Sequence, residues 1–182
     1  CPDCPRNFRG VDVVDNYPLT DMTLEQAKKI FSRDFLCQLN QILINGNYGD
    51  FITARDGLDI VEYFLSSNPD LKIEISSNAS GKPAWWSRLG QLGVHVDFRL
   101  DGLEDTHDLY RQNTDWHTVI TNAMKFIQAG GHATWAMIVF DHNRDQIEEC
   151  RSTSQRLGFE NFWLLDVGRN IIDRKSTRLN SS

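Results

Sequence analysis

Apolar residues recur along this chain at two different spacings, and the two alternate. Over 23–36 the apolar positions follow the three-to-four-residue interval of an amphipathic helix: Leu24, Ala27, Ile30, Phe31 and Phe35. Thr23 and Gln26 have the spacing of a capping box, which predicts where this helix begins. The short apolar run Gln41–Ile44 follows, and the glycine-containing segment 45–50 ends it. We predict a buried strand there, followed by a loop.

The same helix-then-strand unit recurs in the rest of the chain. The pattern predicts helices over 56–65, 84–92, 116–129 and 145–157, and strands over 71–76, 94–100, 133–140 and 162–167. Gly93, Gly130 and Gly158 directly follow three of these helices, as helix-ending glycines do. Strict alternation of helix and strand favours parallel strands joined by right-handed crossovers. We therefore predict an α/β fold, either an open doubly wound sheet or a barrel.

Polar residues that follow the predicted strands are candidate site residues, because parallel α/β folds gather their sites at the carboxyl ends of the strands. These are Gly49 and Asp50, Ser77 and Asn78, Asp101, and Asn143. Asp101 follows an apolar strand, where a carboxylate is costly to bury without a partner, so a site role is favoured over a helix cap. Plain turns remain the alternative at 49–50 and 77–78, and a helix cap at Asn143.

The chain opens on Cys1-Pro2-Asp3-Cys4, a pair of thiols at the spacing that suits one metal ion, one cluster or a redox disulfide. Two ordinary loop cysteines are the alternative. A redox pair is disfavoured because such pairs usually open a helix, whereas Pro5 and Gly10 follow here. Because the chain begins at a cysteine rather than methionine, we expect a fragment cut through a cysteine motif, with a strand before it.

Composition narrows the classes of function. The 182 residues suffice for one domain with a sizeable core, and a net charge of −6 with a pI near 5.3 argues against a nucleic-acid partner. No apolar run approaches the ~20 residues that cross a bilayer, so no membrane partner is expected. Cys37 and Cys150 lie in amphipathic patterns at no ligand spacing, unlike a secreted disulfide framework. We expect a cytoplasmic protein.

Taken together, these motifs resemble those of the radical S-adenosylmethionine (radical SAM) enzymes. Cys1 and Cys4 resemble the second and third cysteines of that family's Cys-x-x-x-Cys-x-x-Cys motif, whose first cysteine would lie four residues before Cys1. Tyr48-Gly49-Asp50-Phe51 resembles the family's Gly-Gly-Glu-Pro run, with Phe51 in place of proline. Leu100-Asp101-Gly102, followed by His107-Asp108 and Arg111, resembles a run found in members that modify peptides.

This resemblance implies a fold and domain limits. It implies a partial (β/α)6 barrel, similar to a TIM barrel with parallel strands, whose first strand is missing from the fragment. The core domain would span 1–170, truncated at its amino end. Residues 171–182 would be a polar tail, disordered or non-native, because they show no hydrophobic period. The resemblance extends to the SPASM/Twitch-containing group, although no auxiliary-cluster cysteines are visible.

The resemblance also implies cofactors and roles. Cys1 and Cys4 would hold a [4Fe–4S] cluster that binds S-adenosylmethionine and cleaves it to a 5′-deoxyadenosyl radical. Contacts with S-adenosylmethionine would come from Gly49, Asp50, Ser77, Asn78, Asp101, Arg111 and Asn143. Arg111 would pair with the ligand carboxylate, the alternative being a surface salt bridge with Asp105 or Asp108. A peptide or protein would be the substrate, and a flavodoxin or ferredoxin the electron donor.

A different class of protein remains open from the sequence. The Cys1 and Cys4 pair could hold a structural zinc ion in a non-catalytic α/β binding module. Metal analysis separates the two hypotheses, since one equivalent of zinc without labile sulfide favours the binding module.

Overall fold

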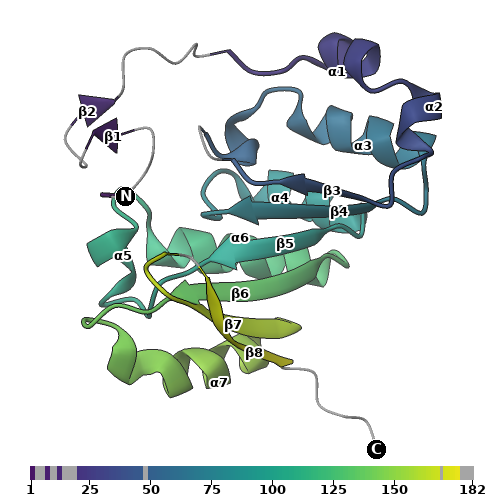
Figure 1. Cartoon of the computed structure of the whole chain (residues 1–182). Coiled ribbons are helices and arrows are strands. Elements are labelled where there is room, and N and C mark those ends of the chain that lie inside the picture. The colour runs from purple at the N-terminus through teal and green to yellow at the C-terminus, as the bar shows by residue number, and fades with distance from the viewer. Residues whose placement is uncertain (3–6, 9–11, 14–19, 47–48, 169, 177–182) are drawn as a thin grey trace, which may run out of the picture.

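The computed structural model describes residues 1–2, 7–8, 12–13, 20–46, 49–168 and 170–176; Cys4 and Tyr48 lie outside them. Its centre is a six-stranded sheet in the order β3-β4-β5-β6-β7-β8 (Figure 1). The strands are β3 (Gln41–Ile44), β4 (Lys72–Ser77), β5 (His95–Arg99), β6 (His132–Ile138), β7 (Asn161–Leu165) and β8 (Ile171–Ser176). The first five are parallel, and β8 pairs antiparallel with β7. A separate pair, β1 (Asn7–Phe8) and β2 (Asp12–Val13), is antiparallel.

Helices connect the parallel strands, as the alternating pattern predicts. The connecting helices are α3 (Gly57–Ser67), α4 (Pro83–Gln91), α5 (His107–Tyr110), α6 (Trp116–Gln128) and α7 (Ile147–Leu157), with 3₁₀ turns η1 (Phe51–Thr53) and η2 (Arg144–Gln146). Two further helices, α1 (Leu24–Ile30) and α2 (Arg33–Leu36), precede β3. The α/β class with a partial, TIM-like sheet of mostly parallel strands is confirmed. No helix in the described part of the chain is long and apolar enough to cross a membrane.

The sheet has one apolar and one polar face, and β5 shows both. Phe98 is fully buried and its ring packs 5.2 Å from that of Trp86 in α4 and 5.4 Å from that of Phe126 in α6. Because strand side chains alternate, Asp97 and Arg99 lie on the opposite face. The helices therefore cover one face of the sheet, and the site has to be sought at the strand ends or on the polar face.

A glycine sets the distance between α4 and α6. A Cβ atom on Gly90 would lie 2.3 Å from the carbonyl oxygen of Phe126 and 2.9 Å from Cβ of Ala129. We predict that Gly90→Ala lowers the free energy of unfolding by about 1–3 kcal/mol, because two helix backbones must separate. The neighbouring exposed residue gives the matched control: Gln91→Ala should change it by less than about 0.5 kcal/mol in the same urea titration. Equal effects would contradict the close approach.

The structure differs from the sequence prediction at the first helix. The predicted helix over 23–36 is divided into α1 and α2, because the backbone leaves helical geometry at Phe31 (φ −107°, ψ 81°). Ser32 then caps α2, its Oγ accepting from the backbone N–H of Phe35 at 3.2 Å. A serine that bonds the backbone locally competes with helix continuation, which apolar periodicity does not report.

The structure also differs at the carboxyl end of the chain. Ile171–Ser176, predicted as part of a polar tail, forms strand β8, while 177–182 lie outside the described residues. Strand pairing uses backbone groups, so the open edge of β7 accepts a strand whose side chains are largely polar. Hydrophobic periodicity alone does not detect such an edge strand.

Candidate functional site

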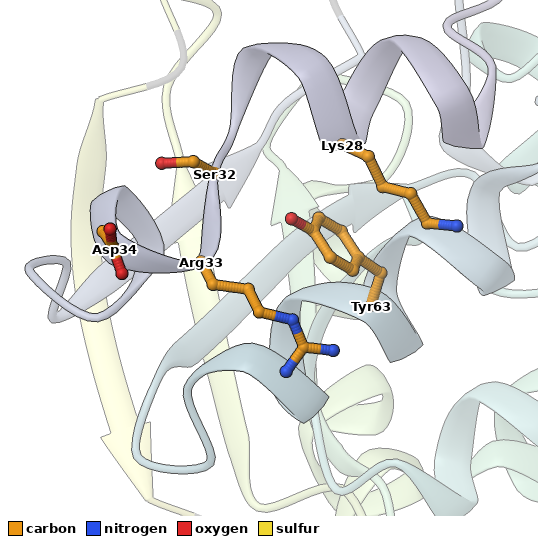
Figure 2. A pocket seen from close by; sticks show the side chains of 5 residues that line it. All are labelled: Lys28, Ser32, Arg33, Asp34 and Tyr63. Atoms are coloured by element: carbon orange, nitrogen blue, oxygen red, sulfur yellow. The ribbon is translucent and has the colours of Figure 1, made fainter.

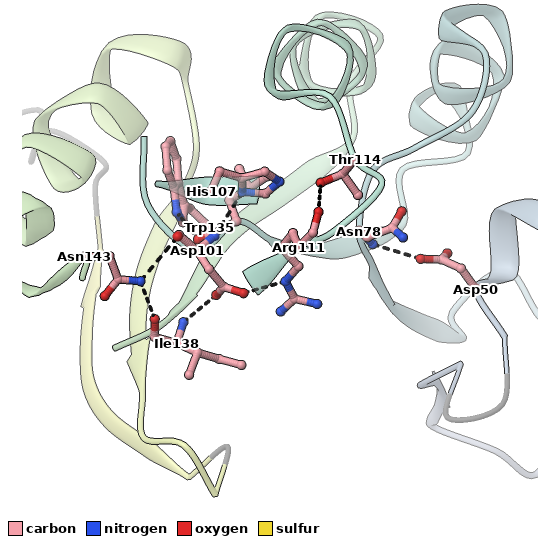
Figure 3. Close-up of polar contacts among 10 residues, drawn as sticks. Asp50, Asn78, Asp101, His107, Arg111, Thr114, Trp135, Ile138 and Asn143 are labelled. Atoms are coloured by element: carbon pink, nitrogen blue, oxygen red, sulfur yellow. Dashed lines mark hydrogen bonds and ion pairs between the residues drawn. The ribbon is translucent and has the colours of Figure 1, made fainter. Parts of the chain in front are cut away.

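Asp101 follows β5 and is fully buried, and all four of its polar atoms are hydrogen-bonded. Its backbone N–H donates to Nδ1 of His107 at 3.3 Å, and its carbonyl oxygen accepts from Nδ2 of Asn143 at 3.3 Å. Its Oδ1 accepts from the N–H of Ile138 at 2.7 Å, and its Oδ2 from Nε of Arg111 at 2.5 Å (Figure 3). The buried carboxylate thus has the partners that a charge needs away from water.

Arg111 is the member of this group that still offers hydrogen-bond donors. Its side chain is 12% exposed, and Nε binds Asp101 while neither Nη group donates to any described residue. Thr114 fixes its backbone, since the Thr114 hydroxyl and N–H both donate to the Arg111 carbonyl oxygen. The alternative of a surface salt bridge to Asp105 or Asp108 is wrong, because the structure pairs Arg111 with Asp101. A planar guanidinium edge is therefore presented at the carboxyl end of β5.

Asp50 joins the loop after β3 to the loop after β4. Its Oδ1 accepts from the hydroxyl of Ser77 at 2.8 Å. Its Oδ2 accepts from the N–H of Asn78 at 2.9 Å (Figure 3). Ser77 is 2% exposed and also accepts from the N–H of Ala79, so its hydroxyl both donates and accepts within the protein. The side chain of Asn78 is half-buried, and its Nδ2 donates to no described residue. Asp50 and Ser77 thus set the position of Asn78.

The pKa of Asp50 links this pair of loops to Arg111. Burial raises the pKa above its ordinary value of 3.8, while hydrogen bonds from Asn78 and Ser77 and the positive charge of Arg111 lower it. Since the folded-state pKa is raised, this group stabilises the fold fully below pH 3.8 and loses that contribution as the pH rises through the folded-state value. The Arg111 effect indicates that both side chains share one electrostatic environment.

We predict that removing the Arg111 charge raises the pKa of Asp50 further. The carboxyl ¹³C signal of Asp50, followed by NMR through an acid titration, should give an apparent pKa above 3.8 in the wild type and a higher one in Arg111→Gln. Arg111→Lys is the matched control, because it keeps a positive charge and should shift the pKa less. An Asp50 titration that is identical in all three proteins would show that the two groups do not interact.

Gly49 lies in the loop after β3, but the glycine that the backbone requires there is Gly46. Gly46 has a φ of +31°, and a Cβ on it would lie 2.3 Å from the carbonyl oxygen of Gly49. Gly49 is half-buried, and its N–H donates to the Gly46 carbonyl oxygen at 3.3 Å. The plain turn that we weighed against a site role is therefore present at Gly49, next to Asp50.

Asn143 lies beneath the site rather than on its surface. It is fully buried, with Nδ2 donating to the carbonyl oxygens of Ile138 (2.9 Å) and Asp101 and with Oδ1 accepting from the N–H of Phe140 (2.8 Å). It makes no side-chain cap to η2, so the helix-cap alternative is wrong. The buried amide orients the backbone of its neighbours. Asn143 has no exposed atom with which to make the predicted contact with a ligand.

Cys1 lies at the same end of the strands as Asp101 and Arg111. It is half-buried and packs against a small apolar cluster of Tyr110, Ala136, Ile138 and Leu165, next to Phe140. Tyr110 precedes Arg111 in the chain, and the N–H of Ile138 binds Asp101. The part of the chain that the structure describes contains no group of three metal-ligating side chains. Of the two predicted metal ligands, Cys1 is placed at this rim and Cys4 lies outside the described residues.

Two supporting residues, Trp135 and Asn122, were not predicted from the sequence, whereas His107 belongs to the run that resembles the radical SAM family. Nε1 of Trp135 donates to the Leu100 carbonyl oxygen at 2.9 Å, and Nδ1 of His107 accepts from Asp101. Nδ2 of Asn122 donates to the carbonyl oxygens of Ala79 (2.8 Å) and Gly81, which fixes the loop after β4. Asn122 could have been found, because it is a polar residue on the buried face of α6.

A shallow depression lies elsewhere, among α1, α2 and α3 (Figure 2). It is lined by Lys28, Ser32, Arg33, Asp34 and Tyr63. The hydroxyl of Tyr63 donates to the carbonyl oxygen of Phe31, so it ties α3 to the end of α1. This surface contains no predicted site residue, and the strand-end group remains the candidate site.

Comparison with known proteins gives structural but not sequence relatives. No family model and no curated protein matches the sequence. Among solved structures, Streptococcus suis SuiB bound to its precursor peptide SuiA has a TM-score of 0.68 at 14% identity, covering 90% of this chain and 38% of that chain. SuiB alone gives 0.65 at 16% identity, covering 82% and 36%. An anSMEcpe structure with bound AdoMet and the Kp18Cys peptide gives 0.64 at 14% identity, covering 90% and 47%.

These structural neighbours are radical SAM enzymes. At such low identity the similarity shows the shared fold alone, a partial TIM-like sheet of mostly parallel strands. The chain spans less than half the length of either neighbour.

Proposed function

We propose that this chain is the core of a radical SAM enzyme, which binds S-adenosylmethionine at the rim that holds Cys1, Asp50 and Arg111. The observation that carries the proposal is that two of these groups lie at one end of the sheet. They are the Cys1 thiol, from the amino end of the chain, and the Arg111 guanidinium after β5, whose Nη groups remain available as donors. The similarity of fold to SuiB and anSMEcpe supports it.

The residues present fit the two cofactors. Cys1 and Cys4 would hold a [4Fe–4S] cluster, which supplies the electron that cleaves the sulfonium of S-adenosylmethionine. Cys1 packs on a group of apolar side chains at the rim, and such surroundings limit the access of water to an iron–sulfur cluster. Arg111 offers two Nη groups at the same rim, a geometry that suits a carboxylate.

The methionine part of S-adenosylmethionine carries one carboxylate and one ammonium group, and the rim offers a partner for each. The carboxylate would bind Arg111, whose Nε is already fixed by Asp101. The ammonium would lie near Asp50 and the Gly49 backbone, and Nδ2 of Asn78 is a further donor for the ligand. Ser77 and Asn143 would act indirectly by holding Asp50 and Asp101 in place.

We propose a peptide or protein as the substrate. SuiB has been solved with the precursor peptide SuiA and anSMEcpe with the Cp18Cys and Kp18Cys peptides, and both share this fold. A radical reacts with the nearest C–H bond, so the substrate must be held close and water kept out. We also propose a cytoplasmic enzyme that receives electrons from a flavodoxin or ferredoxin, because cysteines that are to hold a cluster must not form disulfides, which a reducing compartment prevents.

A reconstitution experiment tests this function. The chain is extended at its amino end by a segment with a cysteine four residues before Cys1, and is loaded with iron and sulfide without oxygen. With dithionite and S-adenosylmethionine, we expect 5′-deoxyadenosine as a product, and no product from the Cys1→Ala variant. Bound zinc without labile sulfide, and no cleavage, would instead favour the structural zinc module.

A further inference from the structure

We propose that His107 is a positioning residue, whose Nδ1 fixes the backbone of Asp101 and thereby the direction of the Arg111 guanidinium. His107 and Arg111 are the first residue of α5 and the residue that caps its end, and the Arg111 N–H donates to the His107 carbonyl oxygen at 3.0 Å. Both side chains reach back to Asp101, one to its backbone and the other to its carboxylate (Figure 3).

The hydrogen bond defines which form of the imidazole is present. The Asp101 N–H is a donor, so Nδ1 of His107 must be the acceptor and the ring hydrogen must be on Nε2. Burial lowers the pKa of His107 to about 4, which keeps the ring neutral at physiological pH. The acceptor is therefore present at physiological pH.

Packing alone does not explain a histidine here. The ring is fully buried, lies 5.4 Å from the ring of Trp116, and has no hydrogen-bond partner for Nε2 among the described residues. A buried donor without a partner is costly. A phenyl ring would fill similar space without that cost, so the property that distinguishes histidine here is the Nδ1 acceptor.

The short length of α5 makes such a bond necessary. A helix of four residues has little stability of its own, so it cannot by itself hold Arg111 at a fixed angle. The carbonyl oxygen of Leu100 is held by Trp135 and the N–H of Asp101 by His107, so the peptide group that joins these two residues is fixed on both sides. An Asp101 that rotated would carry the Arg111 guanidinium with it.

Three variants of His107 separate the acceptor from packing. Asparagine and leucine have nearly the same shape, but only asparagine has an oxygen near the position of Nδ1, while phenylalanine keeps a ring and lacks the acceptor. The measurement is hydrogen exchange of the Arg111 Nε–H, followed by ¹⁵N NMR in the 182-residue chain without ligand. We expect His107→Asn to stay close to the wild-type rate, and His107→Leu and His107→Phe to exchange about threefold to tenfold faster.

A packing role predicts the opposite order, with phenylalanine closest to the wild type and asparagine furthest from it. That order, or equal rates in the asparagine and leucine variants, would overturn the proposal. If the phenylalanine variant does not fold, the comparison of asparagine with leucine still decides. Trp116→Phe is the matched control, since it changes the ring contact, keeps the acceptor and should leave the rate unchanged.

The inference rests on the proposed function only for the identity of the anion that Arg111 would bind. Because the exchange measurement uses no S-adenosylmethionine, a chain that fails to cleave this cofactor can still show the positioning effect. The two proposals therefore fail separately.

Discussion

Replacing Asp101 with alanine is expected to lower the free energy of unfolding by about 3–5 kcal/mol at pH 7. The change leaves the largely buried Arg111 charge without its partner and removes the acceptor of the buried Ile138 N–H. It also opens a cavity where a fully buried side chain lay. Urea denaturation monitored by circular dichroism measures the effect.

Asp141→Ala provides the control for this prediction. Asp141 also forms a salt bridge to an arginine, Arg144, but its side chain is 99% exposed. An exposed pair contributes little, so the change should stay within about 0.5 kcal/mol. Similar losses in the two variants would show that the Asp101 pair does not behave as a buried one.

Replacing Arg111 with glutamine is expected to weaken S-adenosylmethionine binding by about tenfold to a hundredfold. The reason is the loss of a charge-assisted hydrogen bond to the carboxylate, which contributes about 1.5–3 kcal/mol. Binding is measured by calorimetry on the reconstituted, amino-terminally extended chain. The affinity of Arg111→Lys should lie between those of the wild type and Arg111→Gln, because an ammonium keeps the charge but not the planar pair of donors.

Folding has to be separated from binding in this experiment, since Arg111→Gln leaves the Asp101 carboxylate buried without a cation. The double variant Asp101→Asn with Arg111→Gln removes both charges. Its affinity for S-adenosylmethionine should be as low as that of Arg111→Gln. Arg144→Gln, at an exposed arginine, should bind like the wild type. A double variant with wild-type affinity would rule out Arg111 as the carboxylate partner.

The fold followed from the sequence because helix and strand periods alternate so regularly. The apolar run predicts the bounds of β3, and the amphipathic pattern predicts those of α6 to within one residue. The alternation of the two periods predicts the parallel pairing. The break at Ser32 did not follow, since it depends on one local hydrogen bond. Strand β8 did not follow either, because its pairing uses the backbone.

The site was only partly predictable. Asp101 stands out in the sequence as a carboxylate after an apolar strand, and Arg111 lies ten residues further on. The residues that complete the group are distant in sequence: Ile138 binds Asp101 across 37 positions, and Trp135 binds Leu100 across 35. No local pattern encodes such pairs, because they are set by which strands become neighbours in the sheet.

The central claim is that the amino-terminal cysteine and Arg111 lie at the same end of the sheet. A nitroxide label on Cys1, in a chain with Cys4 and Cys37 replaced by serine, tests it by paramagnetic broadening of backbone amide signals. We predict strong broadening at Asp101 and Arg111 and little at His95 and His132, which begin β5 and β6. Broadening at His95 and His132 that spares Arg111 would contradict the account.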